Sequence, residues 1–404
     1  MNRAFLIGIP LAMLLAACGG SGAAPSAPAV APSSPAASVA TPSAAAASAS
    51  TGSSAAAAAS ARPSASAASA AASASAGVSS SASGTSPAAS ASASGNASNT
   101  AGSPPAGKVY TVGISQLVTH PSIDATIQGI KQGMEASGFV EGKNVKYVVE
   151  NAQGQVSNAR AIAEKMNAEN LDLIVPLTTP NSQAMVKVVS KTPVVFGMVT
   201  DPVQAGLVPS YDKPSNTNVT GVYNFNPVEQ QFDDFHIVAP NAKTIGIVYN
   251  AGEQNSVVLV DKARPEAQKL GLKTVDATVT GSNDVASATQ SLVGRADAIY
   301  VPQDNTVVSA FDGVMKIANA NKLPVFAGAP EQVQAGAILT VAYGQVDMGV
   351  QIGKMMAQVL KGANPGSIAP QQPDKTELHL NKTAAASLGL TIPANLLSQA
   401  AQTY

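Results

Sequence analysis

From Lys108 onward, short apolar segments alternate with longer amphipathic ones, and this alternation restricts the possible folds more than any other feature of the chain. The apolar segments are rich in β-branched residues and predict strands at 109–115, 145–150, 171–177, 193–199, 244–250, 273–277, 298–302 and 324–327. Helical patterns lie between them, at 123–137, 158–168, 181–190, 256–270, 284–294 and 307–321. Short strands separated by helices of about ten to fifteen residues are typical of right-handed βαβ units. We therefore expect an α/β fold with parallel sheets.

A weak internal repeat suggests that this alternation occurs in two similar halves. The segment 191–197 (KTPVVFG) resembles 322–328 (KLPVFAG), and at matching offsets 203–207 (VQAGL) resembles 333–337 (VQAGA). Chance similarity between apolar strands is the alternative. After the second copy come a helical pattern at 349–361, a strand-like segment at 377–380 and a last helix, which would let the chain cross back between two lobes.

The first eighteen residues have the pattern of an export signal. Arg3 precedes an apolar run over 4–15 that is too short to span a bilayer permanently. The run ends in Leu-Ala-Ala-Cys-Gly, which resembles the bacterial lipobox, and Cys18 is the single cysteine of the chain. We expect Cys18 to be lipid-modified, which would anchor the chain to a membrane of the bacterial envelope, facing the periplasm or the exterior. An ordinary signal peptide with a chance cysteine is the alternative, and Gly19 does not decide between the inner and the outer membrane.

Residues 19–107 consist almost entirely of Ala, Ser, Pro and Gly, and Arg62 is their one charged side chain before Lys108. Such a segment cannot bury enough apolar surface to offset its conformational entropy. We expect a disordered tether between the membrane anchor and the folded part. The whole chain has 23 Lys and Arg against 24 Asp and Glu, a balance that gives no electrostatic basis for binding nucleic acid.

Polar residues follow the predicted strands at the ends where α/β proteins bind ligands. In the first half these are Ser115, Gln116, His120, Thr178, Thr179, Ser182, Thr200 and Asp201, and in the second half Asn250, Glu253, Asn255, Ser256, Asp304 and Asn305. Each of them could instead cap its own helix. Together, polar strand ends on both halves predict a ligand site in the crevice between two lobes.

Nothing in the sequence indicates catalysis. The three histidines have no metal-binding spacing, and the chain contains no HExxH, GxSxG or phosphate-binding GxxxxGK motif. A single cysteine also excludes an internal disulfide framework and a thiolate metal cluster. We expect a binding protein with no enzymatic activity, cofactor or metal.

Several motifs in order along the chain resemble one family. They are Gln116-xxx-His120-Pro121, Gly138-Phe139-x-Glu141-Gly142-x-Asn144-Val145, Thr200-Asp201-Pro202-Val203-xx-Gly206-Leu207, Asn218-Val219-Thr220-Gly221-Val222, Asn250-xx-Glu253-x-Asn255-Ser256 and Pro302-x-Asp304-Asn305. Together they are similar to the ABC-transporter substrate-binding proteins whose characterised members bind tryptophan and other aromatic amino acids. The resemblance covers essentially all of 108–400.

The resemblance implies a type I periplasmic-binding fold, in which two Rossmann-like lobes joined by three crossings close on the ligand by a hinge motion. It places the lobes at 108–222 plus 340–365 and at 223–339 plus 366–404. The implied partners are a small amino-acid-like ligand, an ABC permease and its ATPase. The sequence leaves three alternatives open: a ligand-sensing receptor without a transport role, a non-amino-acid small solute, and an adhesive or envelope-tethering protein.

The chemistry of the candidate residues suggests roles for them in holding a zwitterion. A ligand carboxylate would lie at the helix start within 178–182, where hydroxyl and amide donors gather. The ligand ammonium needs an anion, for which Asp304 or Glu253 is the first choice and Asp201 the third. Tyr343 and Phe196 would form apolar walls of the pocket or belong to the core.

Overall fold

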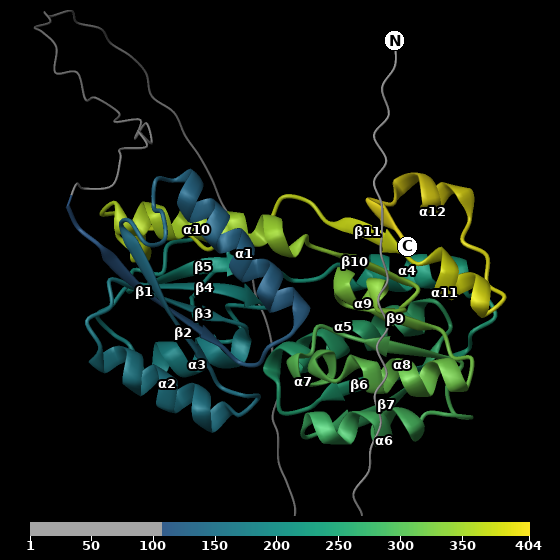
Figure 1. Cartoon of the computed structure of the whole chain (residues 1–404). Helices are drawn as coiled ribbons and strands as arrows, with labels where there is room; N and C mark the ends of the chain where they lie inside the picture. The colour runs from purple at the N-terminus through teal and green to yellow at the C-terminus, as the bar shows by residue number, and fades with distance from the viewer. Residues whose placement is uncertain (1–106) are drawn as a thin grey trace, which may run out of the picture. The chain divides into compact units, whose positions relative to one another are not determined.

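The computed structural model describes residues 107–404, in which two sheets are each covered by helices on both faces (Figure 1). The predicted leader at 1–18, with Cys18, and the predicted tether, apart from Gly107, lie outside the described residues. Within 107–404 none of the helices combines the length and the apolar character needed to cross a membrane.

The first sheet has five strands in the order β2-β1-β3-β4-β5, and all neighbouring strands are parallel. They are β1 (Tyr110–Gln116), β2 (Val145–Asn151), β3 (Leu173–Leu177), β4 (Val194–Val199) and β5 (Val219–Tyr223). The central strands β3 and β4 are buried along their whole length, as expected for a sheet with helices on both faces. The first four strands confirm the prediction, whereas β5 was not predicted.

Helices cover both faces of this sheet. One face carries α1 (Pro121–Ala136) and α10 (Gln345–Leu360), and the other carries α2 (Val156–Ala168) and α3 (Thr179–Val188) (Figure 1). Glycines allow α1 and α10 to pack with their backbones in contact. A Cβ atom added at Gly129 would lie 2.1 Å from the Val346 carbonyl oxygen, and one added at Gly349 would lie 2.2 Å from the Thr126 carbonyl oxygen.

The second sheet has seven strands in the order β12-β11-β10-β9-β8-β6-β7. They are β6 (Thr244–Asn250), β7 (Lys273–Val279), β8 (Ala298–Val301), β9 (Val325–Ala327), β10 (Leu339–Ala342), β11 (Glu377–Leu380) and β12 (Gln402–Thr403). Only the pair β10–β11 is antiparallel in this sheet. The predicted α/β class with parallel sheets is therefore confirmed.

Two sets of helices enclose the second sheet. The core on one face includes residues of α4 (Val228–Val238), α5 (Gln254–Lys269), α11 (Lys382–Ser387) and α12 (Ala394–Gln399). The core on the other face includes α6 (Val285–Gln290), α7 (Asn305–Ser309), α8 (Phe311–Ala320) and α9 (Pro330–Gln334). Two short 3₁₀ turns, η1 (Ser282–Asp284) and η2 (Pro365–Ser367), complete the elements.

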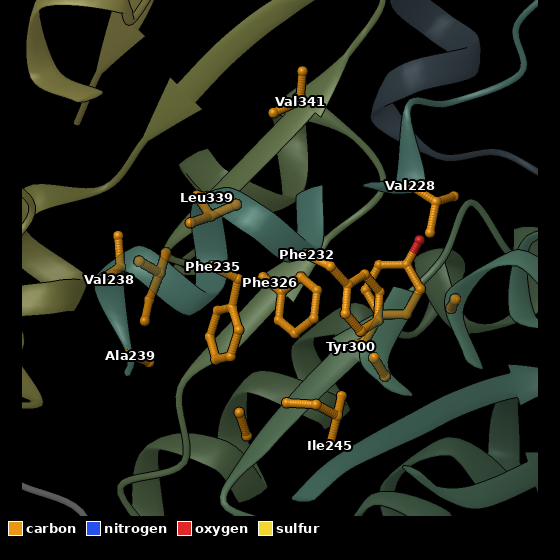
Figure 2. Packing of buried hydrophobic residues seen from close by; sticks show 14 of the residues in the cluster. Val228, Phe232, Phe235, Val238, Ala239, Ile245, Tyr300, Phe326, Leu339 and Val341 are labelled. Atoms are coloured by element: carbon orange, nitrogen blue, oxygen red, sulfur yellow. The ribbon is translucent and has the colours of Figure 1, made fainter. Parts of the chain in front are cut away.

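An aromatic cluster fills the core between α4 and the second sheet (Figure 2). The ring of Phe326 stacks on Phe235 with centroids 4.1 Å apart and meets Phe232 edge-on at 5.0 Å. Tyr300 stacks on the same ring, and its hydroxyl donates to the Gln231 side chain at 2.9 Å. Since the buried hydroxyl has a hydrogen-bond partner, its desolvation is offset, and the cluster packs α4 against β8 and β9.

The ends of the two lobes differ slightly from those expected. Residues 340–342 were assigned to the first lobe, but they belong to β10, which pairs with β9 and β11 in the second sheet. Residues 366–371 were assigned to the second lobe. Instead the Gln371 N–H donates to the Gly221 carbonyl, and Gln371 accepts from the Tyr223 N–H, so this stretch runs along β5 of the first sheet.

The chain crosses between the two sheets three times, after β5, after β10 and before β11. One side chain connects all three crossings. The Gln372 amide donates to the Phe225 carbonyl at 3.3 Å and to the Tyr343 hydroxyl at 2.6 Å. The crossings therefore form a single hydrogen-bonded unit, which fits a hinge between two lobes.

Candidate functional site

A small cavity of about 30 Å³ lies where the carboxyl ends of strands from both sheets meet. Six of its lining residues were predicted from the sequence: His120, Thr178, Thr200, Asn255, Asp304 and Asn305. Six were not: Ser122, Met198, Asn224, Gln303, Val308 and Ala329. The crevice between the lobes thus brings together polar side chains from opposite halves of the chain.

Several polar atoms of this lining are buried without a hydrogen-bond partner in residues 107–404. They are His120 Nδ1, Thr178 Oγ1, Asn224 Oδ1 and Asn255 Oδ1. Leaving a buried donor or acceptor unsatisfied costs about 1–3 kcal/mol, so four such atoms around one cavity are costly for the protein alone. The arrangement suits a ligand that carries its own donors and acceptors.

Thr178 holds an unusual backbone conformation at the edge of the cavity. It is the N-cap of α3 with φ 77° and ψ 158°, a region that glycine occupies and β-branched residues almost never do. Its side chain does not cap the helix, and the hydroxyl oxygen is free of partners among the described residues. The strain therefore places a hydroxyl group, together with the start of a helix, at the cavity.

Two predicted neighbours of Thr178 have structural roles instead. The Ser182 hydroxyl donates to the Thr178 carbonyl at 2.8 Å, within the first turn of α3. The Thr179 hydroxyl oxygen accepts from the Thr200 N–H at 3.3 Å and so ties α3 to the end of β4. Neither lines the cavity, and the hydrogen bonds of both hydroxyl groups go to the protein beside Thr178.

His120 is the N-cap residue of α1 and is 7% exposed. Burial lowers the pKa of its imidazole to about 4, although a contact with the Asn305 side chain of the other lobe acts in the opposite direction. The ring is therefore neutral near pH 7 and offers one donor and one acceptor.

The carboxylates of Glu253 and Asp304 are buried close to α7, and both accept hydrogen bonds from the protein. Glu253 accepts from the backbone N–H groups of Asn305 and Thr306 at 3.1 and 2.9 Å, so it caps α7. Asp304 accepts from the N–H groups of Asn250 and Val307 at 2.6 and 2.8 Å and from the Ser256 hydroxyl at 2.6 Å.

Of these two carboxylates, only Asp304 lines the small cavity. Burial, and then the charge of Glu253, raise the pKa of the Asp304 carboxyl above its usual range. A cationic group beside Asp304 would compensate both effects, because it would neutralise the buried negative charge. Asp304 therefore remains a candidate for the ammonium group of a ligand, and Glu253 supports it from behind.

Other predicted residues lie away from this cavity. Asp201 accepts from the N–H groups of Val203 and Gln204 and from the Tyr211 hydroxyl, so it organises its own loop. Phe196 is fully buried in the core beside α2 and α3, and Tyr343 belongs to the hinge. The predicted residues outside the lining are Ser115, Gln116, Thr179, Ser182, Asp201, Asn250, Glu253, Ser256 and Tyr343.

A second, larger cavity of about 520 Å³ adjoins the first and shares Asn305 with it. It is lined from the first lobe by residues around 117 and 153–157, and from the second lobe by residues around 250–253, 278–282 and 305–309. Asn250 and Glu253 lie here. The crevice between the lobes therefore continues beyond the small cavity.

Side chains that were not predicted join the two lobes across the crevice. The Asn224 amide donates to the Gln303 side-chain oxygen at 3.1 Å, and the Ser122 hydroxyl donates to the Glu331 carboxylate at 2.8 Å. Asn224 follows the unpredicted strand β5, and Gln303 is the unspecified position of a quoted motif. The available signal was a polar residue just after a strand: Asn224 directly follows β5, and Gln303 comes two residues after the end of β8.

Within residues 107–404, no three His, Cys, Asp or Glu side chains gather in a way that could hold a metal ion. The chemistry of the site in the described part of the chain is that of uncharged hydrogen-bonding groups, one buried carboxylate at the cavity and a few apolar side chains.

Comparison with known proteins adds to this picture. The model of a family described as ABC transporter substrate binding protein matches residues 111–404. A tyrosine-binding protein of Clostridioides difficile is 35% identical over 283 residues, which are 70% of this chain and 82% of the relative.

Two solved structures are similar to this chain over most of its length. The ABC domain of Streptococcus pneumoniae in complex with L-Trp is 34% identical, with a TM-score of 0.71 over 74% of this chain and 100% of the other. The ligand-free, open structure of a substrate-binding protein with adhesive properties from Clostridium difficile is 36% identical, with a TM-score of 0.56 over 73% and 99%. At similar identity and coverage, the backbone of this chain as a whole is thus more similar to that of the complex.

The two sheets, the three crossings and these matches confirm the predicted type I periplasmic-binding fold, which more distant solute-binding proteins also share. The family model covers nearly all of the described residues. The relatives match this chain over most of their own length. This chain belongs to the family of ABC transporter substrate-binding proteins.

Proposed function

We propose that this chain binds an aromatic L-amino acid between its lobes and delivers it to an ABC permease outside the cytoplasm. The observation that carries the proposal is the group of buried, unpartnered polar atoms around one cavity, contributed by both lobes. The two relatives whose ligands are named, a tyrosine-binding protein and a complex with L-Trp, favour an aromatic side chain.

The site has separate groups for the two charges of an amino acid. The Thr178 hydroxyl and the start of α3 would receive the carboxylate, since helix N-termini favour anions. The ammonium would lie against Asp304, with the unpartnered oxygens of Asn224 and Asn255 as further acceptors. Ser182 and Glu253, which the sequence suggested for direct contact, would support the site through their hydrogen bonds to the protein, and Asp201 would hold its own loop.

Binding requires the lobes to move. A cavity of about 30 Å³ holds one or two water molecules, so an amino acid needs the lobes and the lining side chains to separate. Rotation about the three crossings, which Gln372 connects, would open the crevice, and the contacts across it would form again around the ligand.

We also propose that the chain leaves its ligand chemically unchanged. The imidazole at the cavity is neutral and buried, and the carboxyl oxygens of Asp304 accept three hydrogen bonds from the protein. These two groups are therefore suited to hold a ligand by hydrogen bonds and charge. Mass spectrometry of L-Trp recovered from the protein should show the unmodified amino acid, and a product that accumulates with time would contradict the proposal.

Anchoring through a diacylglycerol on Cys18, with residues 19–107 as a tether, is part of the same proposal. Two or three acyl chains would hold the protein stably at a membrane, where it could feed a permease. Replacement of Cys18 by Ser should release the protein from membranes into the soluble fraction of the expressing bacterium. If Cys18→Ser stays with the membranes, the anchor lies elsewhere.

Isothermal titration calorimetry of the purified chain with L-Trp, L-Tyr, L-Phe, L-Leu and allitol tests the ligand class. We expect saturable one-to-one binding of at least one aromatic amino acid, weaker binding of L-Leu and none of allitol. Binding of the polyol alone, or equal affinity for L-Leu and the aromatic amino acids, would contradict the proposal.

A further inference from the structure

Strand β4 contains a local irregularity that ends at the cavity. Phe196 pairs with Gly221 of β5, and Val199 pairs with Tyr223, so three steps along β4 match two steps along β5. One extra residue is therefore accommodated in β4, which is the definition of a β-bulge. Met198 lies in this bulge with φ 56°, a backbone conformation that few non-glycine residues adopt.

The bulge changes the face of the sheet to which Met198 belongs. In a regular strand, residues two apart lie on the same face, so Phe196 and Met198 would share one. Instead, Phe196 packs in the core beside α2 and α3, whereas Met198 packs in the core beside α1 and α10. Val199, the next residue, returns to the core of Phe196. The irregularity thus directs one side chain, Met198, to the cavity.

The other apolar residues of the cavity lining come from the opposite lobe. They are Val308 of α7 and Ala329, which directly precedes α9. The remaining lining residues are polar. The apolar part of the lining is therefore made by Met198 from the first lobe and by Val308 and Ala329 from the second.

We propose that Met198 is a specificity-determining residue whose thioether contacts the aromatic ring of the ligand. This inference rests on the proposed function. It identifies the residue of the protein that selects an aromatic side chain in the ligand. Methionine is suited to the role, because its unbranched chain adapts to rings of different size and its sulfur interacts favourably with aromatic groups. A β-branched residue would be strained at this backbone conformation.

The test compares Met198→Leu, Met198→Gln and Met198→Gly with Lys322→Gly. Lys322 also has a positive φ, 53°, but it is exposed and does not line the cavity, so Lys322→Gly reports the effect of relieving such strain alone. Dissociation constants for L-Trp, L-Tyr, L-Phe and L-Leu would be measured by calorimetry, and thermal unfolding of each variant would show that it is folded.

We expect Met198→Gln and Met198→Gly to lose about tenfold or more in affinity for the aromatic amino acids and less in affinity for L-Leu. The preference for aromatic amino acids over L-Leu should therefore become smaller. Met198→Leu keeps an apolar side chain but lacks the sulfur, so its affinity for the aromatic amino acids should fall by about two- to fivefold. The control Lys322→Gly should keep the wild-type ratio of affinities within about threefold. If Met198→Gln fails to fold, the comparison of Met198→Gly with Met198→Leu decides.

An unchanged ratio between the affinities for aromatic amino acids and for L-Leu in folded Met198→Gln and Met198→Gly would overturn the inference while leaving the proposed function intact. Failure of the wild-type chain to bind any aromatic amino acid would overturn both. The two failures are therefore distinguishable within one set of titrations.

Discussion

The Ser122 hydroxyl donates to the Glu331 carboxylate at 2.8 Å, and this hydrogen bond joins α1 of the first lobe to α9 of the second. Ser122 is 2% exposed and also lines the small cavity. A hydrogen bond to a charged acceptor at such a place contributes more than a typical neutral one. We therefore expect the contact to act as a latch that forms when the lobes approach each other.

Loss of this latch should weaken ligand binding through faster release. We expect Ser122→Ala to lower affinity by about five- to tenfold, mainly through the dissociation rate, because the closed arrangement loses about 1 kcal/mol or somewhat more. Stopped-flow measurement of L-Trp dissociation checks this. Ser137→Ala is the matched control, since the Ser137 hydroxyl bonds the Gly133 carbonyl within the first lobe. Equal dissociation rates for Ser122→Ala and wild type would contradict the latch.

Thr178 should show opposite effects on stability and on binding. Thr178→Gly relieves about 1–3 kcal/mol of backbone strain. The added freedom of glycine in the unfolded chain costs about 0.5–1 kcal/mol. The free energy of unfolding of the ligand-free protein should therefore rise by about 1 kcal/mol. It also removes the hydroxyl that faces the cavity, so affinity for the amino acid should fall about tenfold. Urea unfolding and calorimetry measure the two effects.

Thr178→Ser is the control for this pair of effects, because it keeps the hydroxyl and most of the strain. We expect it to bind within about threefold of the wild type. If Thr178→Gly bound the ligand as tightly as Thr178→Ser, the hydroxyl would have no role in binding.

Protonation of His120 should destabilise the fold in mildly acidic solution. The pKa of this imidazole is about 4 in the folded protein against about 6.5 when unfolded, so the unfolded chain binds more protons between these values. Its contribution to stability is complete above about pH 6.5 and is lost as the pH falls towards 4.

A fall from about pH 7 to about pH 5 should lower the free energy of unfolding by on the order of 2 kcal/mol through this one group. Urea unfolding of the wild type and of His120→Gln at both pH values isolates that share, since the variant cannot titrate at this position. The stability loss should be smaller in His120→Gln. The same loss in both proteins would show that His120 is not the group responsible.

The backbone contact between α1 and α10 should be intolerant of a single added methyl group. A Cβ at Gly349 would lie 2.2 Å from the Thr126 carbonyl oxygen and 2.8 Å from Gly129 Cα, and backbone atoms cannot move aside cheaply. We expect Gly349→Ala to lower the free energy of unfolding by about 3 kcal/mol. Gly281 provides the control, because no atom lies within 4 Å of a Cβ added there. Gly281→Ala should change the free energy of unfolding by less than about 1 kcal/mol. Similar unfolding curves for the two variants would contradict the close packing.

Most of the fold could be predicted from the sequence, because the buried strands are short apolar segments with helical patterns between them. Strand β5 was missed, since Val219–Tyr223 is short and contains Thr220 and Gly221, which weaken the apolar pattern. The lobe boundary near 340 was displaced, because strand pairing between β9, β10 and β11 is not visible in local composition.

The site could be predicted only in part. His120, Thr178 and Asp304 follow strands and begin helices, so the rule that ligands bind at the carboxyl ends of strands finds them. The same rule selected Ser182 and Asp201, whose side chains serve their own helix and loop. Local sequence cannot separate these cases, because the partner of a polar group is decided by tertiary contacts.

The residues that were missed depend on geometry far from local sequence. Met198 reaches the cavity through a bulge that alters the alternation of β4, and the apolar pattern of 193–199 gives no sign of it. Val308 and Ala329 become relevant when the opposite lobe lies against Met198. That these residues line one cavity becomes apparent only from the three-dimensional arrangement of both lobes.

The most direct test of the account is the fluorescence of L-Trp on titration with this protein. The chain contains no tryptophan, so the added L-Trp is the only indole emitter, and excitation at a wavelength that tyrosine does not absorb isolates its emission. The account predicts a saturable blue shift of the indole emission, reversed by excess L-Tyr or L-Phe and unaffected by allitol, because the ring leaves water for a buried cavity. Emission that stays that of free L-Trp at every protein concentration, together with no displacement signal from the other aromatic amino acids, would contradict it.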